Sequence, residues 1–243
     1  MTEINTKTRL SELQKYHTIG RTKWLTIIIM AILIAIYAIY ASLSMLLYTL
    51  PNTISPDLQG SFYDRQFLFY IHMLFGAPAV TLGAIIINGR FQRKHLNLHR
   101  KFGYIYIYSV WLSGTSGLIL AFFSAVGWVD HIGFATLAVL WLYTTTMGFK
   151  FATEKNYEKH INWMVRSYSL TFAAVTLRLW MPILITIFSV LKFQNPFFVA
   201  YPIISFLCWV PNIIFAERII QKRRLQFHQV ENKHSFTSLG NIS

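Results

Sequence analysis

Six long apolar runs follow one another along the chain, separated by short polar segments. They cover residues 24–50, 67–88, 102–128, 132–149, 167–191 and 197–216. A helix needs about 20 residues, within a range of about 17 to 25, to cross the hydrocarbon core of a bilayer. Every run is long enough, and only the fifth contains a formal charge, Arg178. The pattern predicts an all-α membrane protein with six transmembrane helices in a lipid bilayer.

The polar residues divide the chain around this single domain. We expect a polar head over residues 1–23, a transmembrane domain over residues 24–217, and a basic, disordered tail over residues 218–243. The first apolar run is too long for the core of a signal peptide, and it lacks a clear cleavage site of small residues. We therefore interpret it as an uncleaved first helix. The second to fifth helices are expected to form a four-helix core.

The basic residues are distributed unevenly between the two sides of the expected membrane. Of the 22 lysines and arginines, 19 lie in the head, in the loops 90–101 and 150–166, and in the tail, which six helices place on one side. By the positive-inside rule, both termini are cytoplasmic and the chain spans the cell's inner (plasma) membrane. Basic residues beside anionic headgroups also explain the net charge of +13 without nucleic acid as a partner.

Other common kinds of functional site have no signature in the sequence. Only 13% of the residues are charged, about half of the fraction usual in soluble domains. The single cysteine, Cys208, lies within an apolar run, which excludes an intramolecular disulfide and a cysteine-based metal site. No glycine-rich nucleotide loop, nucleophile triad or pair of carboxylates stands out.

Four of the eight histidines fall one per helix on the second to fifth helices, at matched depths. The topology places His72 and His131 near the outer face and His99 and His160 near the inner face. A low-spin b-type haem needs two neutral imidazoles from facing helices. We therefore expect two haem b groups, one ligated by His72 and His131 and one by His99 and His160. Together they would form a two-step electron path across the bilayer.

Other interpretations of these positions stay open. A histidine at a helix end is more often a solvated interfacial residue than a ligand, and His95 shares a helical face with His99 and competes with it. Gly76 and Gly103 each follow a candidate ligand by four residues, which would leave room for a macrocycle on the same face. Glycines at such positions are also common in ordinary helix packing within membranes.

Arg178 needs a partner, because a charge in the hydrocarbon core is costly. A haem propionate is one candidate partner; Asp130, Asp64 or a backbone carbonyl are the others. Arg178 follows His160 by 18 residues, which is five turns of a continuous helix and about 27 Å. The two side chains would then point the same way, with Arg178 at the depth of the outer histidine pair.

Three segments carry a resemblance to known families. HRKFGYIY at residues 99–106, HINWMVRSY at residues 160–168 and LTFAAVTLR at residues 170–178 resemble the bacterial predicted membrane proteins of domain-of-unknown-function family 2306. The likeness covers the second to fifth helices and implies no activity.

The broader plan is similar to the cytochrome b561 superfamily, which has six helices and four haem-ligating histidines on helices 2 to 5. This resemblance implies the same pairs, His72 with His131 and His99 with His160. That superfamily keeps its ligands inside the membrane. The inner haem would therefore be shallow unless the third and fifth helices begin before their apolar runs. No ascorbate-site motif is recognisable.

We expect the chain to carry out transmembrane electron transfer as a di-haem, b-type cytochrome-like protein, such as a membrane ferric or quinone reductase. Whether it is an enzyme stays open; the class suggested is a transmembrane oxidoreductase with small-molecule or protein electron donors and acceptors. The main alternative is a cofactor-free small transporter or sensor in which His72 and Arg178 line a polar cavity. A non-catalytic subunit of a larger complex is a third interpretation.

Overall fold

The computed structural model describes residues 19–46, 65–124 and 126–240 of the 243-residue chain, and it contains no β-strand in these ranges. The all-α class expected from the sequence is therefore confirmed. In chain order the helices are α2 (Arg21–Leu46), α4 (Gln66–Ile86), α5 (Gly89–Lys94), α6 (Leu96–Ala121), α7 (Trp128–Thr153), α8 (Tyr157–Thr171), α9 (Ala173–Val190), α10 (Pro196–Leu207) and α11 (Val210–Gly240).

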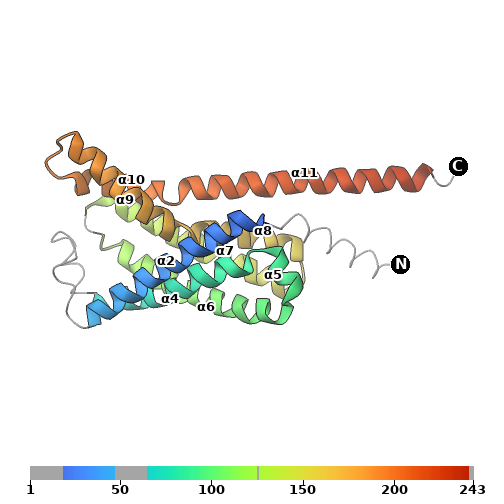
Figure 1. The fold of residues 1–243 in the computed structure, drawn as a ribbon, viewed down its shortest axis with the longest axis horizontal. Helices are drawn as coiled ribbons and strands as arrows, with labels where there is room; N and C mark the ends of the chain where they lie inside the picture. Colours follow the sequence, from blue (N-terminus) through green and yellow to red (C-terminus); the bar gives the residue numbers. More distant parts are fainter. Residues whose placement is uncertain (1–18, 47–64, 125, 241–243) are drawn as a thin grey trace.

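Four helices form a ring at the centre of the bundle. α4 packs against α6, α6 against α7 and α7 against α8, while α8 returns to contact α4. α6 and α8 therefore lie on one diagonal of the ring, and α4 and α7 lie on the other. α2 packs along α4, α10 packs against α7 and α9, and the long α11 runs from α8 beyond the bundle (Figure 1). Side chains from diagonally placed helices can meet only across the interior of such a ring.

Within the described residues, five helical stretches are long and apolar enough to cross a bilayer. They are Gln66–Ile86, Leu96–Ala121, Trp128–Thr153, Tyr157–Val190 and Pro196–Leu225. The first span expected from the sequence, residues 24–50, corresponds to α2, a 26-residue helix. Residues 47–50 of the expected span lie outside the described ranges. Large apolar side chains such as Val190 (74% exposed) and Leu33 (60% exposed) cover the outside of the helices. Such a surface is stable against lipid tails rather than water.

Two helices begin before the apolar runs that predict them. α6 begins at Leu96 and α8 at Tyr157, whereas the corresponding runs start at residues 102 and 167. The start of α8 is fixed by Asn156, whose side-chain oxygen accepts a hydrogen bond from the Lys159 backbone N–H at 3.3 Å. His99 and His160 therefore both lie inside helices, as a membrane-embedded pair of ligands requires.

Two other segments differ from the sequence prediction. The fifth span is not one continuous helix: α8 ends at Thr171, α9 begins at Ala173, and the Val175 N–H donates to the Phe172 carbonyl at 2.9 Å. The predicted alignment of the His160 and Arg178 side chains assumed one continuous helix, so it no longer follows. The tail expected to be disordered is part of α11, which extends to Gly240.

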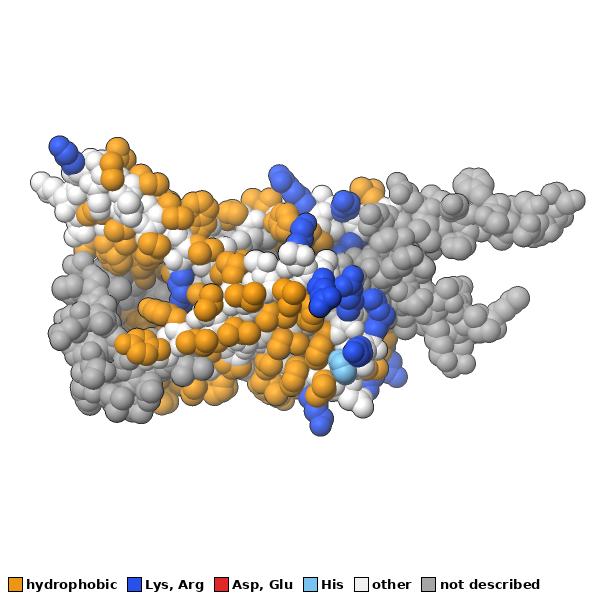
Figure 2. Space-filling model, in the orientation of Figure 1, with side chains coloured by type: hydrophobic (Ala, Val, Ile, Leu, Met, Phe, Trp, Pro, Cys, Tyr) orange, Lys and Arg blue, Asp and Glu red, His pale blue; other side chains and the backbone are white. Residues whose placement is uncertain are grey.

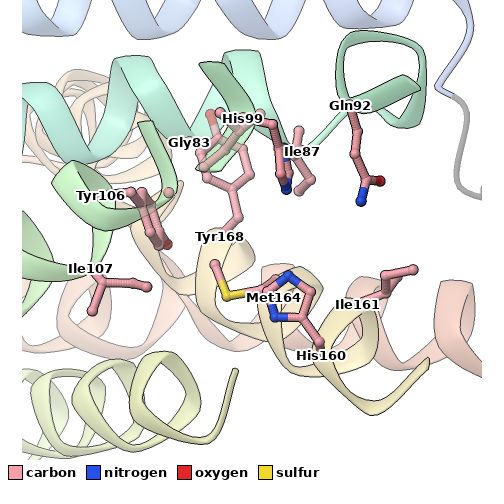
Figure 3. A pocket seen from close by; sticks show the side chains of 12 residues that line it. Gly83, Ile87, Gln92, His99, Tyr106, Ile107, His160, Ile161, Met164 and Tyr168 are labelled. Atoms are coloured by element: carbon pink, nitrogen blue, oxygen red, sulfur yellow. The ribbon is translucent and has the colours of Figure 1, made fainter. Parts of the chain in front are cut away.

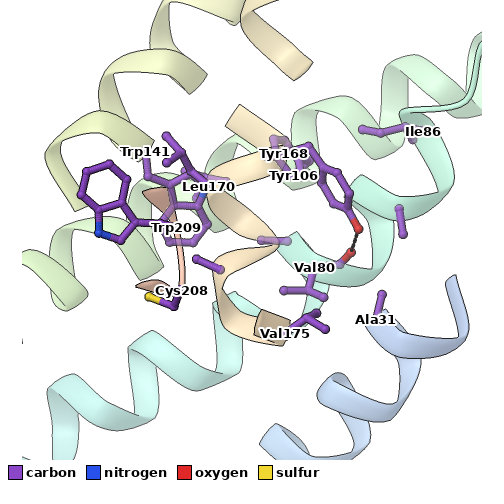
Figure 4. Packing of buried hydrophobic residues seen from close by; sticks show 14 of the residues in the cluster. Ala31, Val80, Ile86, Tyr106, Trp141, Tyr168, Leu170, Val175, Cys208 and Trp209 are labelled. Carbon is purple, nitrogen blue, oxygen red and sulfur yellow. Dashed lines mark hydrogen bonds between the residues drawn. The ribbon is translucent and has the colours of Figure 1, made fainter. Parts of the chain in front are cut away.

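The interior joins all the packed helices through one large apolar cluster. Trp141, Leu170 and Trp209 lie together in it, Val175 lies beside Val80, and Tyr168 donates a hydrogen bond to the Val80 carbonyl at 3.3 Å (Figure 4). Cys208 is fully buried in the same cluster and is a free thiol. This packing holds α4, α7, α8 and α10 in fixed positions.

Charged residues of the described part concentrate at one end of the bundle. Figure 2 shows lysine and arginine side chains gathered near α5, with hydrophobic atoms over the middle of the molecule. At the same end, Arg166 of α8 and Glu217 of α11 form an ion pair in which Arg166 Nη2 lies 2.8 Å from Glu217 Oε2. The middle of the bundle is therefore the part suited to the hydrocarbon core.

Candidate functional site: two cavities joined by buried hydroxyl groups

One cavity lies on the α6–α8 diagonal and brings His99 and His160 together. We name it the inner cavity, after the pair of histidines expected near the inner face. The two imidazoles point toward one another from α6 and α8 (Figure 3). Tyr106, Tyr168 and Met164 line the same cavity. The inner pair expected from the sequence is therefore assembled on opposite walls of a single space.

Hydrogen bonding sets the ring nitrogens that this pair can offer to a ligand. His160 Nδ1 lies 2.8 Å from the Gly148 carbonyl oxygen. A carbonyl can only accept, so Nδ1 carries the proton and Nε2 keeps its lone pair. The Nδ1 atom of His99 is buried and has no hydrogen-bond partner among the described residues. A histidine that ligates a metal commonly donates its other N–H to a carbonyl in this way.

The space between the two imidazoles is small. The inner cavity has a volume of about 60 Å³. A Cβ atom added at Gly103, which lines it, would meet no heavy atom within 4 Å. Met164 is a flexible side chain on the opposite wall, where it packs against Gly148. The donor set fits a bis-histidine haem, and a macrocycle would fit only if lining side chains such as Met164 moved apart.

His95 does not reach this cavity. It caps the end of α5, lies exposed, and packs its ring against Phe91 with 5.6 Å between the ring centres. Of the two histidines that share this helical face in the sequence, His99 is therefore the one directed inward.

The outer cavity is five times larger and contains His72 and Arg178. Its volume is about 300 Å³, and its walls come from α2, α4, α6, α7, α8, α9 and α10. His72 Nδ1 lies 2.9 Å from the Ser113 carbonyl, so Nδ1 donates and Nε2 keeps its lone pair. A Cβ atom added at Gly117 would lie 2.8 Å from His72 Nδ1. A glycine is therefore needed there for the imidazole to pack against α6.

His131 does not join His72 in this arrangement. Its Nε2 lies 3.0 Å from the Ser124 carbonyl of the preceding loop, and its ring packs on Trp128. His131 lines neither of the two cavities. The depth expected for His131 does not bring its side chain to the interior, because the helix rotation directs it to the loop.

Arg178 is held by weak partners only. Its Nη1 donates to the Ala174 carbonyl at 2.7 Å, and its guanidinium carbon lies 5.2 Å from the centre of the Tyr37 ring. No carboxylate contacts Arg178 among the described residues. Of the carboxylates proposed as partners, Asp130 hydrogen-bonds to Ser124 and to the Val126 N–H, and Asp64 lies outside the described ranges.

A chain of buried side-chain hydrogen bonds connects the two cavities. Tyr106, which lines the inner cavity, bonds to Ser167 at 2.7 Å and to Thr171 at 2.8 Å. Thr171 lines the outer cavity and accepts from Trp141 Nε1 at 2.8 Å. Ser167 in turn bonds to Thr145 at 2.6 Å. The polar groups at the centre of the bundle therefore satisfy one another, as a low-dielectric interior requires.

Sequence reasoning did not identify this network, nor Gly83 and Gly117, which leave room for side chains that line the cavities. Tyr106, at the centre of the network, is fully buried. Of the two glycines expected to leave room for a macrocycle, Gly103 faces open space, whereas Gly76 packs against the Ser113 hydroxyl at 3.3 Å from its ideal Cβ position. Hydroxyl residues on three neighbouring apolar helices were the signal in the sequence that could have indicated the network.

The described residues contain no group of three or more histidine, cysteine, aspartate or glutamate side chains placed to hold a metal ion. A bis-histidine haem site needs only two protein ligands, and so it does not depend on such a group.

Comparison with known proteins gives a match to one family model. Residues 69–220 match the family described as "Predicted membrane protein (DUF2306)", so the match extends from α4 into α11 and includes all residues that line the inner cavity and all but Ile34 of those that line the outer one. No curated protein and no solved structure matches the chain.

Proposed function

The chain belongs to the family of predicted membrane proteins DUF2306, whose description names no activity, and we propose that it transfers electrons across a membrane through haem b held between α6 and α8. His99 and His160 are the proposed axial ligands. In this proposal α2 is a sixth span and both termini are cytoplasmic. The basic residues that gather at one end support this orientation, and the membrane in the proposal is the cell's inner membrane.

One observation carries the proposal: the two imidazoles face one another across the inner cavity with nitrogens available for ligation. His160 Nε2 is left free because Nδ1 donates to the Gly148 carbonyl. A buried imidazole nitrogen without a partner, such as Nδ1 of His99, costs free energy until a ligand satisfies it. When bound, the group would supply reversible one-electron chemistry at its iron.

The residues around the pair have distinct roles in this proposal. The Gly148 carbonyl fixes the orientation and tautomer of His160. Gly103 keeps one wall of the cavity free of side-chain atoms. The basic residues Arg100 and Lys101, next to His99 in the chain, would attract an anionic electron donor at the cytoplasmic face.

A second haem ligated by His72 and His131 stays a prediction. His72 lines the outer cavity with a free Nε2, but His131 is hydrogen-bonded to the Ser124 carbonyl. A second haem with both ligands would require His131 to leave this hydrogen bond and turn inward.

The proposal is tested by the absorption spectrum of the purified protein. The protein is produced in cells supplied with haem, purified in detergent, and measured oxidised and after reduction with dithionite. We expect sharp b-type bands in the reduced protein. His99→Ala and His160→Ala should each remove the inner haem, whereas His95→Ala, at the exposed neighbouring histidine, should keep it. His72→Ala then reports on the second haem, because it lowers the haem content by about half only where two groups are bound.

Absence of reduced b-type bands from folded wild-type protein would falsify the haem proposal. Equal losses from His95→Ala and His99→Ala would also contradict the assigned ligand, since only His99 lines the cavity.

A second candidate function is favoured by the outer cavity. His72 and Arg178 line the same space of about 300 Å³, as a cofactor-free transporter or sensor would require. This volume is at the lower end of the range of about 300–1,000 Å³ found for small-molecule sites. Two results together would favour transport or sensing without haem. The spectrum would lack haem bands, and a small molecule would raise the thermal stability of the protein.

A further inference from the structure

We propose that the outer cavity is a binding site for an amphipathic molecule with a carboxylate group, and that Arg178 binds this carboxylate. The inference concerns a site separate from the inner histidine pair, and it does not depend on haem being bound there.

The charge of Arg178 is the first argument. Arg178 lies twelve residues before the end of α9 at Val190, which is about 18 Å along the helix and well inside a span. Its contacts in the described structure are the Ala174 carbonyl and the Tyr37 ring. A guanidinium carries five N–H donors, and one carbonyl satisfies few of them. A cation within the hydrocarbon region pairs with an anion or with backbone carbonyls, and the single Ala174 carbonyl leaves most of the guanidinium donors for a ligand.

The shape of the guanidinium selects the anion. Its planar fork pairs with the two oxygens of a carboxylate through parallel hydrogen bonds, a geometry that lysine does not offer. His72 adds a second polar group to the wall of the same cavity. Its Nε2 has no hydrogen-bond partner among the described residues and can accept from a hydroxyl or a protonated carboxyl group.

The remaining walls fit the apolar part of such a molecule. Small residues from three helices open the space, and larger apolar side chains such as Leu170 complete it. The small residues are Gly76, Ala77, Gly114, Gly117 and Ala138. The volume is about twice that of an engineered cavity of about 150 Å³ that stays dry and binds benzene. A cavity with one cation, a few polar groups such as His72, and mostly apolar walls matches a carboxylate joined to a hydrocarbon body.

Two sources can supply this chemistry: a fatty acid from the bilayer, or a propionate group of haem. Both place a carboxylate at Arg178, and they differ in what fills the rest of the cavity. The experiment therefore includes both molecules.

The test measures binding of a fluorescent polyene fatty acid to the full-length, haem-free protein in detergent, with its methyl ester as the uncharged control. We expect the acid to bind at least tenfold more tightly than the ester. Arg178→Gln should weaken acid binding at least tenfold and leave ester binding unchanged, while Arg178→Lys should recover part of the affinity. Arg218→Gln, at an exposed arginine of α11, should behave as wild type.

A second arm identifies the source. The titration is repeated after loading with haem, and again with haem as a competitor. Displacement of the acid by haem, together with loss of haem from Arg178→Gln, would assign the carboxylate to a propionate. Unchanged binding of the acid to haem-loaded protein would assign it to a lipid-derived acid. Both results support the carboxylate site.

Two results would overturn the inference: equal affinity for acid and ester in the wild type, or no effect of Arg178→Gln on binding of the acid. If Arg178→Gln does not fold, the comparison of acid with ester in the wild type, and in Arg178→Lys, still decides. Failure here leaves the inner haem untouched, because His99→Ala reports on that site by its spectrum.

Discussion

Two glycines that line the inner cavity should respond in opposite ways to the same substitution. A Cβ atom at Gly83 would lie 2.5 Å from two ring carbons of Tyr168 and 2.9 Å from a ring carbon of Tyr106. A Cβ atom at Gly103 would meet nothing within 4 Å. Gly83→Ala and Gly103→Ala therefore compare an occupied position with an open one in a single cavity.

The structure sets the size of each effect. Neither ring beside Gly83 can retreat freely, because Tyr168 hydrogen-bonds to the Val80 carbonyl and Tyr106 is held by two hydroxyl groups. Overpacking costs about 1–3 kcal/mol, and replacing a helical glycine by alanine returns about 0.5–1 kcal/mol. Gly83→Ala should thus destabilise the protein by about 1–2 kcal/mol. Gly103→Ala should stabilise it by about 0.5–1 kcal/mol, because only the helix contribution applies.

The assay is thermal unfolding of the purified, haem-free protein in one detergent. For a chain of this length, 1 kcal/mol corresponds to a shift in Tm of about 2–4 °C. Gly83→Ala should lower Tm by about 2–8 °C and Gly103→Ala should raise it by up to about 4 °C. A fall of similar size in both variants would refute the assigned packing. Gly103→Leu extends the test: filling the open space should remove bound haem while leaving the fold intact.

Three further outcomes follow from the structure. Arg166→Gln and Glu217→Gln should each destabilise the attachment of α11 to α8, and a double-mutant cycle on Tm should give a coupling of about 0.5–1 kcal/mol, because Glu217 is partly exposed. Additive effects would show that the ion pair does not form. Tyr106→Phe should cost about 1 kcal/mol in denaturant unfolding, since it removes two hydrogen bonds worth about 0.6 kcal/mol each in a membrane. No loss would show that the hydroxyl network is not formed. A reporter that works only in the cytoplasm should be active when it is fused after Ser243. Activity of a reporter that works only in the periplasm, fused at the same place, would show that the topology is reversed.

The apolar runs predicted the helices themselves well and their ends poorly. Long charge-free segments must be helical in a bilayer, because every backbone N–H and C=O has to be satisfied within the segment. The starts of α6 and α8 were missed because charged residues lie within their first two turns, Arg100 and Lys101 in α6 and Glu158 and Lys159 in α8. Asn156 before α8 is an N-cap signal that could have located that start.

The sequence indicated the depth of each histidine but not the direction of its side chain. Depth depends only on position along a helix, and on this basis the sequence placed His99 and His160 at one level, where the structure brings both into a single cavity. Direction depends on the rotation of the helix and on local hydrogen bonds. His131 was paired with His72 on depth alone, yet the Ser124 carbonyl, seven residues earlier in the chain, holds its ring at the loop. The break at Phe172 likewise has no proline or glycine to announce it.

The hydroxyl network gives the two cavities a shared wall, so a change in one cavity should affect the other. Thr171, at the end of α8, lines the outer cavity and bonds to Tyr106, which lines the inner cavity. Every hydroxyl in the network has a partner, so a displacement of Tyr106 would leave Thr171 and Ser167 each short of one hydrogen bond in a low-dielectric interior. A ligand that moves Tyr106 in the inner cavity should therefore alter the outer one, at the point where Trp141 donates to Thr171. Thermodynamic reciprocity then requires occupancy of the outer cavity to change affinity at the inner histidines by the same factor.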